Sequence, residues 1–315
     1  MTNNNGTLHT AKFNKKDEFY TQLCDIESEL QYYESHFENK VVYCNCDDPR
    51  YSNFYRYFIN NFEKLKLKKV ICAGYNISKS GQGAYHEYTG VEDVSDIPNS
   101  LKYFDWNGDF RSFESIKLLK ECDIVVTNPP FSLFREYVAQ LVNFKKSFLI
   151  IGNVNAITYK EIFGWIKENR VWLGINLGRG VSGFIVPSNY ELYGTETKID
   201  NEGNRIISPN NCLWLTNLDN HIRHEKIPLV KKYTGFEEKY PHYDNYDAIN
   251  VNKTSDIPVD YPGVMGVPIT FLHKFNPDQF EIIKFRKGND DKDLSINGKC
   301  PYFRILVRRI DYPTV

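Results

Sequence analysis

Short apolar runs alternate with segments of helical periodicity up to about residue 220 of this chain. The apolar runs lie at 41–46, 70–73, 123–127, 147–151, 171–175 and 212–216. Between them, apolar side chains recur every three or four residues, at 26–37, 54–65, 134–141 and 162–167. This alternation is typical of βαβ units, whose strands form a parallel sheet with helices packed on it. The sequence therefore predicts an α/β fold.

The pattern weakens after residue 220, where aromatic, Asn and Asp residues become frequent. A stretch rich in Gly, Pro and Asn at 178–211 interrupts the alternation and is expected to form a hairpin over the functional face. The 315 residues have room for two domains of ordinary size. We predict a larger domain at 1–220, with its insertion at 178–211, and a smaller region at 221–315.

Several classes of protein are disfavoured by composition. Residues 1–16 are polar and lack the apolar core of a signal peptide, and no run approaches the ~18 apolar residues of a membrane span. We therefore expect a soluble, cytoplasmic protein. The seven cysteines include one C-x-C pair, Cys44 and Cys46, without a second pair or a nearby His, so we predict no metal site. A net charge of −1 argues against non-specific coating of nucleic acid.

Basic residues are concentrated near the C-terminus. This pattern is compatible with a phosphate-contacting surface and equally with a solvated face. From residue 281 onward the basic residues are Lys284, Arg286, Lys287, Lys292, Lys299, Arg304, Arg308 and Arg309.

A rigid polar loop follows the apolar run 123–127. Its residues are Asn128, Pro129, Pro130 and Phe131. The two prolines end the strand ladder and hold the loop rigid. In an open α/β sheet, ligands bind at this carboxyl edge. We therefore take the loop as the candidate catalytic element.

This tetrad suits methylation of an exocyclic amine such as adenine N6, whose lone pair is delocalised into the ring. The Asn128 side-chain oxygen and the Pro129 carbonyl can each accept one amine hydrogen and turn the lone pair toward an electrophilic methyl group. Phe131, the last residue of the tetrad, is expected to stack on a base that has been extruded from the duplex. The amine proton becomes acidic as the nitrogen gains positive charge, so this chemistry needs neither a metal nor a strong base.

Three stretches are candidates for binding the methyl donor. Thr21 precedes the first helix and is a plausible N-cap. The second stretch, residues 47–52, follows the first predicted strand, where doubly wound folds bind nucleosides. The third contains Asp109, whose carboxylate can accept a hydrogen bond from an adenine amine, and Phe110, whose ring can stack on adenine. The predicted cofactor-binding residues are Phe19, Tyr20, Thr21, Asp47, Asp48, Pro49, Ser52, Asp109 and Phe110.

Five strings of residues resemble the EcoRI-type adenine-specific modification methylases, a family of DNA amino-methyltransferases. The resemblance spans nearly the whole chain, and such long strings are far more specific than the tetrad. They lie at 17–22, 44–50, 128–134, 178–184 and 265–271.

The resemblance implies a class I, Rossmann-like S-adenosylmethionine-dependent methyltransferase domain followed by a target-recognition region. It implies methyl transfer to adenine N6 of a flipped base in a short palindrome of double-stranded DNA, with GAATTC as the first guess. It also implies a monomer that protects host DNA from a partner restriction endonuclease without a stable complex. The cofactor motif precedes the catalytic loop, and target recognition comes last, as in the gamma arrangement of these enzymes.

Two features depart from the wider methyltransferase pattern. Residues 47–50, Asp-Asp-Pro-Arg, stand where a glycine-rich loop usually follows the first strand. The acidic ribose ligand expected after the second strand is also missing, and Asn76 stands near its place.

Residues that read DNA are expected in the C-terminal region, because Asn reads adenine and Lys reads guanine by hydrogen bonding. Ordinary loop polarity remains the alternative for each one. The candidates are Asn250, Asn252, Lys253, His273, Lys274 and Asn276.

Other functions remain open on the residues alone. The same loop would serve methylation of cytosine N4, an RNA adenine or a protein glutamine amide. A DNA-binding regulator that has lost catalysis would be expected to have a broken tetrad, and the tetrad is intact. An NAD-dependent oxidoreductase is disfavoured because the glycine-rich fingerprint is absent.

Overall fold

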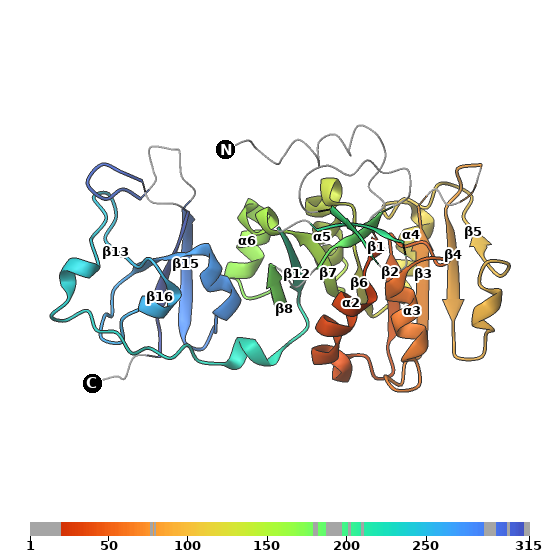
Figure 1. The fold of residues 1–315 in the computed structure, drawn as a ribbon, viewed down its shortest axis with the longest axis horizontal. Coiled ribbons are helices and arrows are strands. Elements are labelled where there is room, and N and C mark those ends of the chain that lie inside the picture. Colours follow the sequence, from red (N-terminus) through yellow and green to blue (C-terminus); the bar gives the residue numbers. More distant parts are fainter. Residues whose placement is uncertain are drawn as a thin grey trace. The chain divides into compact units, whose positions relative to one another are not determined.

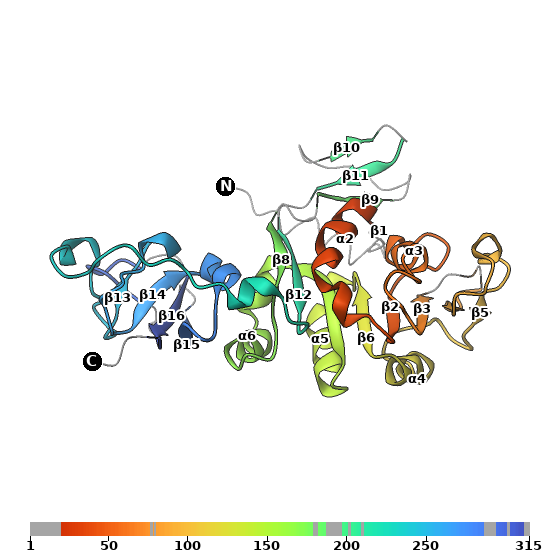
Figure 2. The same cartoon turned by 90° about the horizontal axis from the view of Figure 1, so that it is seen from below.

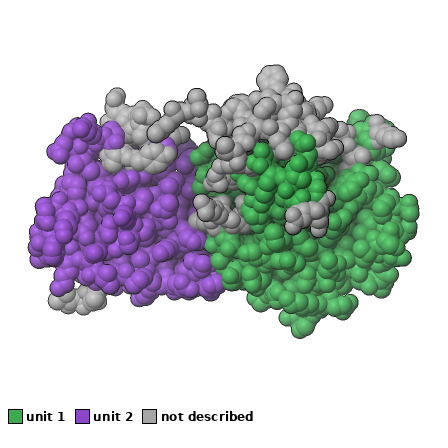
Figure 3. Space-filling view, viewed as in Figure 1, with its two compact units in different colours: residues 1–156, 174–218 green, residues 157–173, 219–315 purple. Residues whose placement is uncertain are grey.

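The computed structural model describes residues 20–75, 78, 80–178, 182–186, 197–200, 203–208, 211–286, 294–300 and 303–311. The chain divides into two compact units (Figure 3). Unit 1 comprises Met1–Ala156 and Gly174–Leu218, and unit 2 comprises Ile157–Leu173 and Asp219–Val315. Residues 157–173, placed in the larger domain by the sequence prediction, therefore belong to unit 2, and the functional boundary near residue 220 stays a prediction.

An eight-stranded sheet forms the centre of unit 1, with strand order β5-β4-β3-β2-β6-β7-β12-β8 (Figure 1). Strands β3, β2, β6 and β7 are mutually parallel, whereas β4 runs antiparallel to β3, β5 antiparallel to β4, and β12 antiparallel to β7. The mixed α/β architecture expected from the sequence is confirmed. The strands are β2 (Val41–Asn45), β3 (Lys69–Gly74), β4 (Ala84–Tyr88), β5 (Lys102–Tyr103), β6 (Ile124–Thr127), β7 (Ser147–Asn153), β8 (Trp172–Gly178) and β12 (Cys212–Thr216).

The strand order of the sheet reverses at β2, which makes this strand the topological switch point. From β2 the chain moves outward to β3, and it later returns to form β6 on the other side of β2. At such a point the loops that follow the two strands diverge and leave a crevice at the carboxyl edge. The loops after β2 and β6 therefore border the predicted ligand site.

Helices cover both faces of this sheet (Figure 2). On one face lie α2 (Leu23–Leu30) and α3 (Asn53–Asn60), and on the other α4 (Phe113–Glu121) and α5 (Phe134–Asn143). The single helix predicted at 26–37 is α2 followed by a 3₁₀ helix, η1 (Gln31–His36). The remaining 3₁₀ helices before residue 160 are η2 (Val94–Asp96), η3 (Phe131–Leu133) and η4 (Val154–Thr158).

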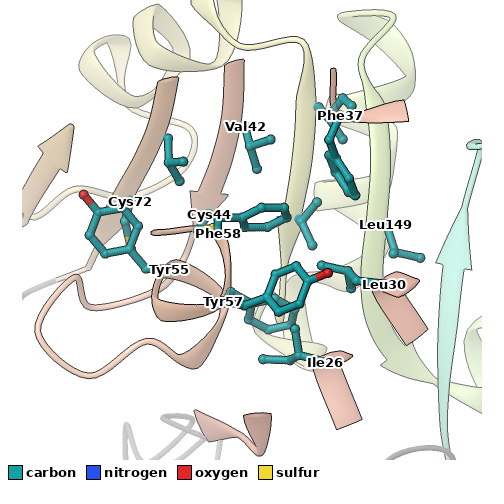
Figure 4. Close-up of a cluster of buried hydrophobic side chains, with 14 of the residues drawn as sticks. Ile26, Leu30, Phe37, Val42, Cys44, Tyr55, Tyr57, Phe58, Cys72 and Leu149 are labelled. Atoms are coloured by element: carbon teal, nitrogen blue, oxygen red, sulfur yellow. The ribbon is translucent and has the colours of Figure 1, made fainter. Parts of the chain in front are cut away.

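The core beneath α2 and α3 explains why these helices form. Leu30 and Phe58 are fully buried and pack among strand side chains that include Val42 and Leu149 (Figure 4). Phe58 also meets Phe37 edge to face, with ring centroids 5.1 Å apart. Burying each such side chain contributes about 1.5–3 kcal/mol, which anchors the helices on the sheet.

A second, four-stranded sheet in unit 1 has the order β1-β9-β11-β10. It is fastened to α2, because the Asp25 carboxylate accepts the Ser182 backbone N–H at 2.9 Å and Gln22 donates to the Gly183 carbonyl at 3.0 Å. The predicted insertion thus contributes antiparallel strands to a sheet that begins with the N-terminal strand. The strands are β1 (Tyr20–Thr21), β9 (Phe184–Val186), β10 (Thr197–Ile199) and β11 (Arg205–Ile207).

Unit 2 contains a four-stranded sheet of order β13-β14-β16-β15. Helix α6 (Lys160–Lys167) packs on β15, with the Phe163 and Phe285 rings 5.1 Å apart. None of the described helices has the length and apolar character needed to cross a bilayer. The strands are β13 (Ile249–Asn250), β14 (Met265–Pro268), β15 (Phe280–Arg286) and β16 (Arg304–Arg309); the 3₁₀ helices are η5 (His221–His224), η6 (Glu237–Lys239), η7 (Thr254–Asp256) and η8 (Ile269–Lys274).

Truncating Phe58 tests this account of the core. Phe58→Ala should lower the free energy of unfolding by about 3–5 kcal/mol, because the ring is 0% exposed and leaves a cavity. Phe113→Ala on α4, where the ring is 83% exposed, should change it by less than about 0.5 kcal/mol. Chemical denaturation of both variants gives the comparison, and equal losses would contradict the assigned packing.

Candidate active site

The ends of β2 and β6 are joined by a short polar contact. Thr127, the last residue of β6, places its Oγ1 2.6 Å from Oδ2 of Asp47, which follows β2. The same hydroxyl also contacts the backbone carbonyl of Asn45. Because Asn128 follows Thr127 directly, this contact holds the start of the predicted catalytic loop against the end of β2.

Asp47 is the centre of this junction. It is only 8% exposed. Its carboxylate accepts the Ser52 hydroxyl and the backbone N–H of Asn128, in addition to contacting Thr127. The pKa of Asp47 is raised to about 7, because burial and, to a smaller extent, the neighbouring Asp48 outweigh the hydrogen bonds that favour the carboxylate.

The rest of the loop after β2 is rigid. Asp48 holds Arg50 through two parallel contacts, Nε to Oδ1 at 3.0 Å and Nη2 to Oδ2 at 2.6 Å. Pro49 is buried, and fully buried Ser52 caps α3 by accepting the Tyr55 backbone N–H at 3.1 Å. The prediction that Ser52 opens this helix is confirmed.

The N-terminal segment reaches the same edge. The Asn53 side chain donates to the Thr21 carbonyl at 2.8 Å, and the Tyr20 and Tyr51 rings meet edge to face at 6.3 Å. Thr21 is in strand β1, and Gln22 occupies the N-cap position of α2 without a side-chain cap. The prediction that Thr21 caps the helix is therefore wrong, because pairing with β9 holds it in extended backbone.

Phe131 connects the predicted catalytic loop to this segment. Its ring lies 6.2 Å from that of Phe184, at an interplanar angle of 70°. Phe184 pairs with Thr21 across β1 and β9. Within unit 1, the structure thus brings together the predicted cofactor residues Tyr20 and Thr21 and the tetrad. Asn128, Pro130 and Phe131 are partly buried, and Pro129 is buried.

The third predicted cofactor stretch has a different environment. Gly108 has φ +76° and approaches the end of β3, where an added Cβ would lie 2.8 Å from the Gly74 carbonyl oxygen. Asp109 is held by Arg111, which lowers the pKa of Asp109. Phe110 is 4% exposed and packs edge to face on Tyr137 at 5.0 Å. This packing does not support the predicted stacking of Phe110 on a ligand ring.

Phe19 and Asn76 lie outside the described residues. Tyr75, immediately after β3, is described and 48% exposed. Asn45 is a further residue of this edge that sequence reasoning missed. Its buried Nδ2 has no hydrogen-bond partner among the residues that the structure describes. The sequence signal that could have identified Asn45 is a polar residue at the last position of a strand that is otherwise apolar.

The predicted DNA-binding residues of unit 2 fall into two groups. Asn250 is buried and accepts hydrogen bonds from Tyr243 at 2.8 Å and Arg304 at 3.0 Å. Asn276 is also buried and accepts the Asp278 backbone N–H at 2.8 Å. These partners indicate structural roles and do not support base contacts by either residue.

The other four candidates are more accessible. Asn252, Lys253 and Lys274 are exposed, and His273 is partly buried. Burial and the neighbouring Lys274 lower the pKa of His273, which favours its neutral form.

Known proteins resemble this chain over almost its full length. The family model described as "Adenine-specific methyltransferase EcoRI" matches residues 7–310. Type II methyltransferase M.EcoRI of Escherichia coli is 67% identical over 96% of both chains. Two further relatives are M.MpnI of Mycoplasma pneumoniae, 40% identical, and M.MgeORF184P of Mycoplasma genitalium, 37% identical, each over 96% of this chain and 98% of its own. No solved structure gives a significant match.

The raised pKa of Asp47 predicts a pH-dependent contribution to stability. Because the folded-state pKa is about 7 and the unfolded value is near 3.8, protonated Asp47 stabilises the fold fully below about pH 4, and this contribution is lost as the pH rises through about 7. The difference in unfolding free energy between the wild type and Asp47→Asn should therefore shift toward the variant between about pH 4 and about pH 7 and stay constant at higher pH. A pH-independent difference, measured by denaturation across this range, would contradict the raised pKa.

Proposed function

Because this chain belongs to the EcoRI family of adenine-specific methyltransferases, we propose that it transfers a methyl group from S-adenosylmethionine to adenine N6 in a short palindrome of double-stranded DNA. The observation that carries the proposal is the position of the Asn128–Phe131 loop. It stands at the switch point of the sheet, where Thr127 and Asp47 fasten it to the end of β2. Ligands of open α/β sheets bind at this kind of edge.

The residues around this edge fit a methyl donor with nucleoside and amino-acid parts. Thr21 Oγ1 is a buried polar atom with no hydrogen-bond partner in the described part of the chain, so it is suited to a polar ligand group. Tyr20, Asp48, Pro49 and Ser52 border the same edge. We assign the donor's binding to this group, and the buried Asp47 holds the adjoining ends of β2 and β6 together. S-adenosylmethionine supplies an electrophilic methyl group when bound.

The tetrad is suited to present the acceptor amine. In the proposed mechanism, the Asn128 side-chain oxygen and the Pro129 carbonyl each accept one N6 hydrogen. With the donor bound, the amine nitrogen would direct its lone pair at the methyl carbon and form the N–C bond as the bond from that carbon to the donor's sulfur breaks. The donor would leave as S-adenosylhomocysteine, and the positively charged nitrogen would release one proton to water. Pro130 limits movement of the loop, and the Asp47 contact with the Asn128 backbone N–H holds its first residue.

Phe131 is the proposed platform for the flipped adenine. An enzyme that modifies N6 has to remove the base from the stack, and aromatic rings stabilise such bases. The partly buried Phe131 ring is held edge to face by Phe184, so its orientation is set before DNA binds.

We further propose that unit 1 has the class I, Rossmann-like methyltransferase fold and that residues 221–315 form the target-recognition region. The parallel strands β3, β2, β6 and β7, with antiparallel β12 between β7 and β8, support the fold assignment. The guess GAATTC for the palindrome rests on the resemblance to the EcoRI family. Asn252, Lys253, His273 and Lys274 remain candidates for DNA contacts.

We also propose that the protein acts as a monomer in the cytoplasm, where host DNA is available. Methylation at one palindrome would protect that DNA from a partner restriction endonuclease, with no stable complex between the two enzymes. The similarity to Type II methyltransferases supports this role.

Product analysis tests both the reaction and the loop. Plasmid DNA from cells that express the chain should carry N6-methyladenine at one palindrome when read by long-read modification sequencing. Asn128→Ala should lose most of this methylation and still bind donor and DNA. Asn99→Ala, which replaces an exposed residue of another loop, is the matched control and should remain active. Unmodified DNA from the wild type would overturn the proposed reaction, and near-normal methylation by Asn128→Ala would overturn the role of the loop.

A second experiment isolates the stacking role of Phe131. Phe131→Ala should weaken binding of a duplex with 2-aminopurine at the target position by about 1–3 kcal/mol and reduce the fluorescence gain on flipping. Phe131→Tyr keeps the ring and should restore both. Equal fluorescence gains in the wild type and Phe131→Ala would remove Phe131 from base stabilisation.

A further inference from the structure

A groove with a volume of about 470 Å³ lies within unit 2. It is lined by residues of the segment from Val230 to Tyr240 and by Asn252 and Asp256. Asn252 is one of the predicted DNA-binding residues, and Lys253 follows it. The groove therefore includes part of a surface that sequence reasoning associated with DNA, together with residues that it did not single out.

Three lysines line this groove, Lys231, Lys232 and Lys239, and all are exposed. Within the described part of the chain, none of these side chains takes part in an ion pair or a hydrogen bond. The basic tail behaves differently, since Arg308 pairs with Glu281 at 2.8 Å and Arg309 with Asp311 at 2.5 Å. The groove lysines are thus available for an external anion, whereas these two arginines are engaged internally.

Acidic residues near the groove only partly offset this charge. Asp256 lines it directly. Asp260 accepts the Tyr233 and Thr234 backbone N–H groups at 2.6 and 3.1 Å, and Glu237 accepts the Gly235 N–H at 2.9 Å. These hydrogen bonds leave Asp260 and Glu237 negatively charged, and neither residue lines the groove. Among the lining residues, three lysines face one aspartate, which leaves the groove positive.

The groove also has an apolar part. Val230 is 77% exposed and Phe236 is 45% exposed. The Lys239 ammonium lies 4.6 Å from the centre of the Phe236 ring, so the cation is held beside an apolar surface. Lining side chains this exposed indicate a shallow groove, because pockets for small ligands bury most of the ligand surface. Alternating apolar and cationic contacts suit the sugar rings and phosphates of a nucleic-acid strand.

We propose that this groove binds the phosphodiester backbone of duplex DNA, with Lys231, Lys232 and Lys239 contacting phosphates and Val230 and Phe236 contacting deoxyribose. This inference rests on the proposed function, because it deepens the assignment of DNA as the substrate. Phosphate contacts determine affinity and register, and they carry no base preference themselves. The groove would therefore position the duplex while other residues read its sequence.

The salt dependence of DNA binding tests this inference. The double variant Lys231→Gln, Lys239→Gln removes two cations. The only described interaction of their ammonium groups that it breaks is the contact of Lys239 with the Phe236 ring. The slope of log binding constant against log salt concentration should become shallower by about 0.9 for each phosphate that the variant no longer neutralises. The affinity of the variant for DNA should fall by the same factor for duplexes that contain the target palindrome and for duplexes that lack it. The matched control is Lys117→Gln with Lys120→Gln, two exposed lysines of α4, and its slope should equal that of the wild type.

The outcomes separate this inference from the proposed function. An unchanged slope in the Lys231 and Lys239 variant, or an equal change in the α4 control, would overturn the groove assignment while wild-type methylation stands. A wild-type protein that neither binds nor methylates duplex DNA would overturn the proposed function itself. Donor binding by each variant, measured by calorimetry, should match the wild type and shows that unit 1 is intact. An unchanged circular-dichroism spectrum and unfolding transition show that unit 2 is folded as well.

Discussion

The contact between Asp47 and Thr127 joins the two strand ends on which the candidate active site depends. β2 and β6 are neighbours in the sheet, and their following loops diverge because the chain changes direction between them. The Asp47 carboxyl group spans this divergence by contacting Thr127, Ser52 and the Asn128 backbone. One buried side chain therefore positions the start of the tetrad and the start of α3. Its elevated pKa is the electrostatic consequence of placing a carboxyl group at a buried junction.

The sequence predicts those parts of the structure whose physical cause is local. Continuous apolar runs predicted β2, β3, β6, β7 and β12, because strands buried on both faces read as unbroken apolar segments. Strands β4 and β5 were missed because Ala84–Tyr88 and Lys102–Tyr103 are polar or exposed at the sheet edge. The tetrad was found because its prolines and its position after a strand are visible without any tertiary contact.

Other residues could not be assigned from sequence because their environment depends on distant segments. Thr21 reads as a helix cap, but a strand partner about 160 positions away holds it in extended backbone. Phe110 reads as a ligand-stacking ring, but Tyr137 covers it. Asn250 reads as a base-contacting amide, yet Tyr243 and Arg304 occupy its oxygen. In each case the residue type is compatible with function, and tertiary burial decides its role.

The cationic residues of unit 2 also show that tertiary contacts, and not residue type alone, decide the role of a side chain. A count of charges points to the C-terminal tail, whereas the described interactions show Arg308 and Arg309 paired with acids and Lys231 and Lys239 unpaired within the described chain. Pairing therefore separates cations that stabilise the fold from cations that are available to a substrate. For a DNA-modifying enzyme with a net charge of −1, a local positive groove reconciles an almost neutral chain with an anionic substrate.

The most direct test of this account is a double-mutant cycle on Asp47 and Thr127, read as the single-turnover rate of adenine methylation. Asp47→Ala and Thr127→Val each remove one side of the contact. If the contact positions the tetrad, the double variant should lose less than the sum of the single losses, with a coupling energy of about 0.5–3 kcal/mol. Strictly additive losses would contradict the claim that this contact organises the active site.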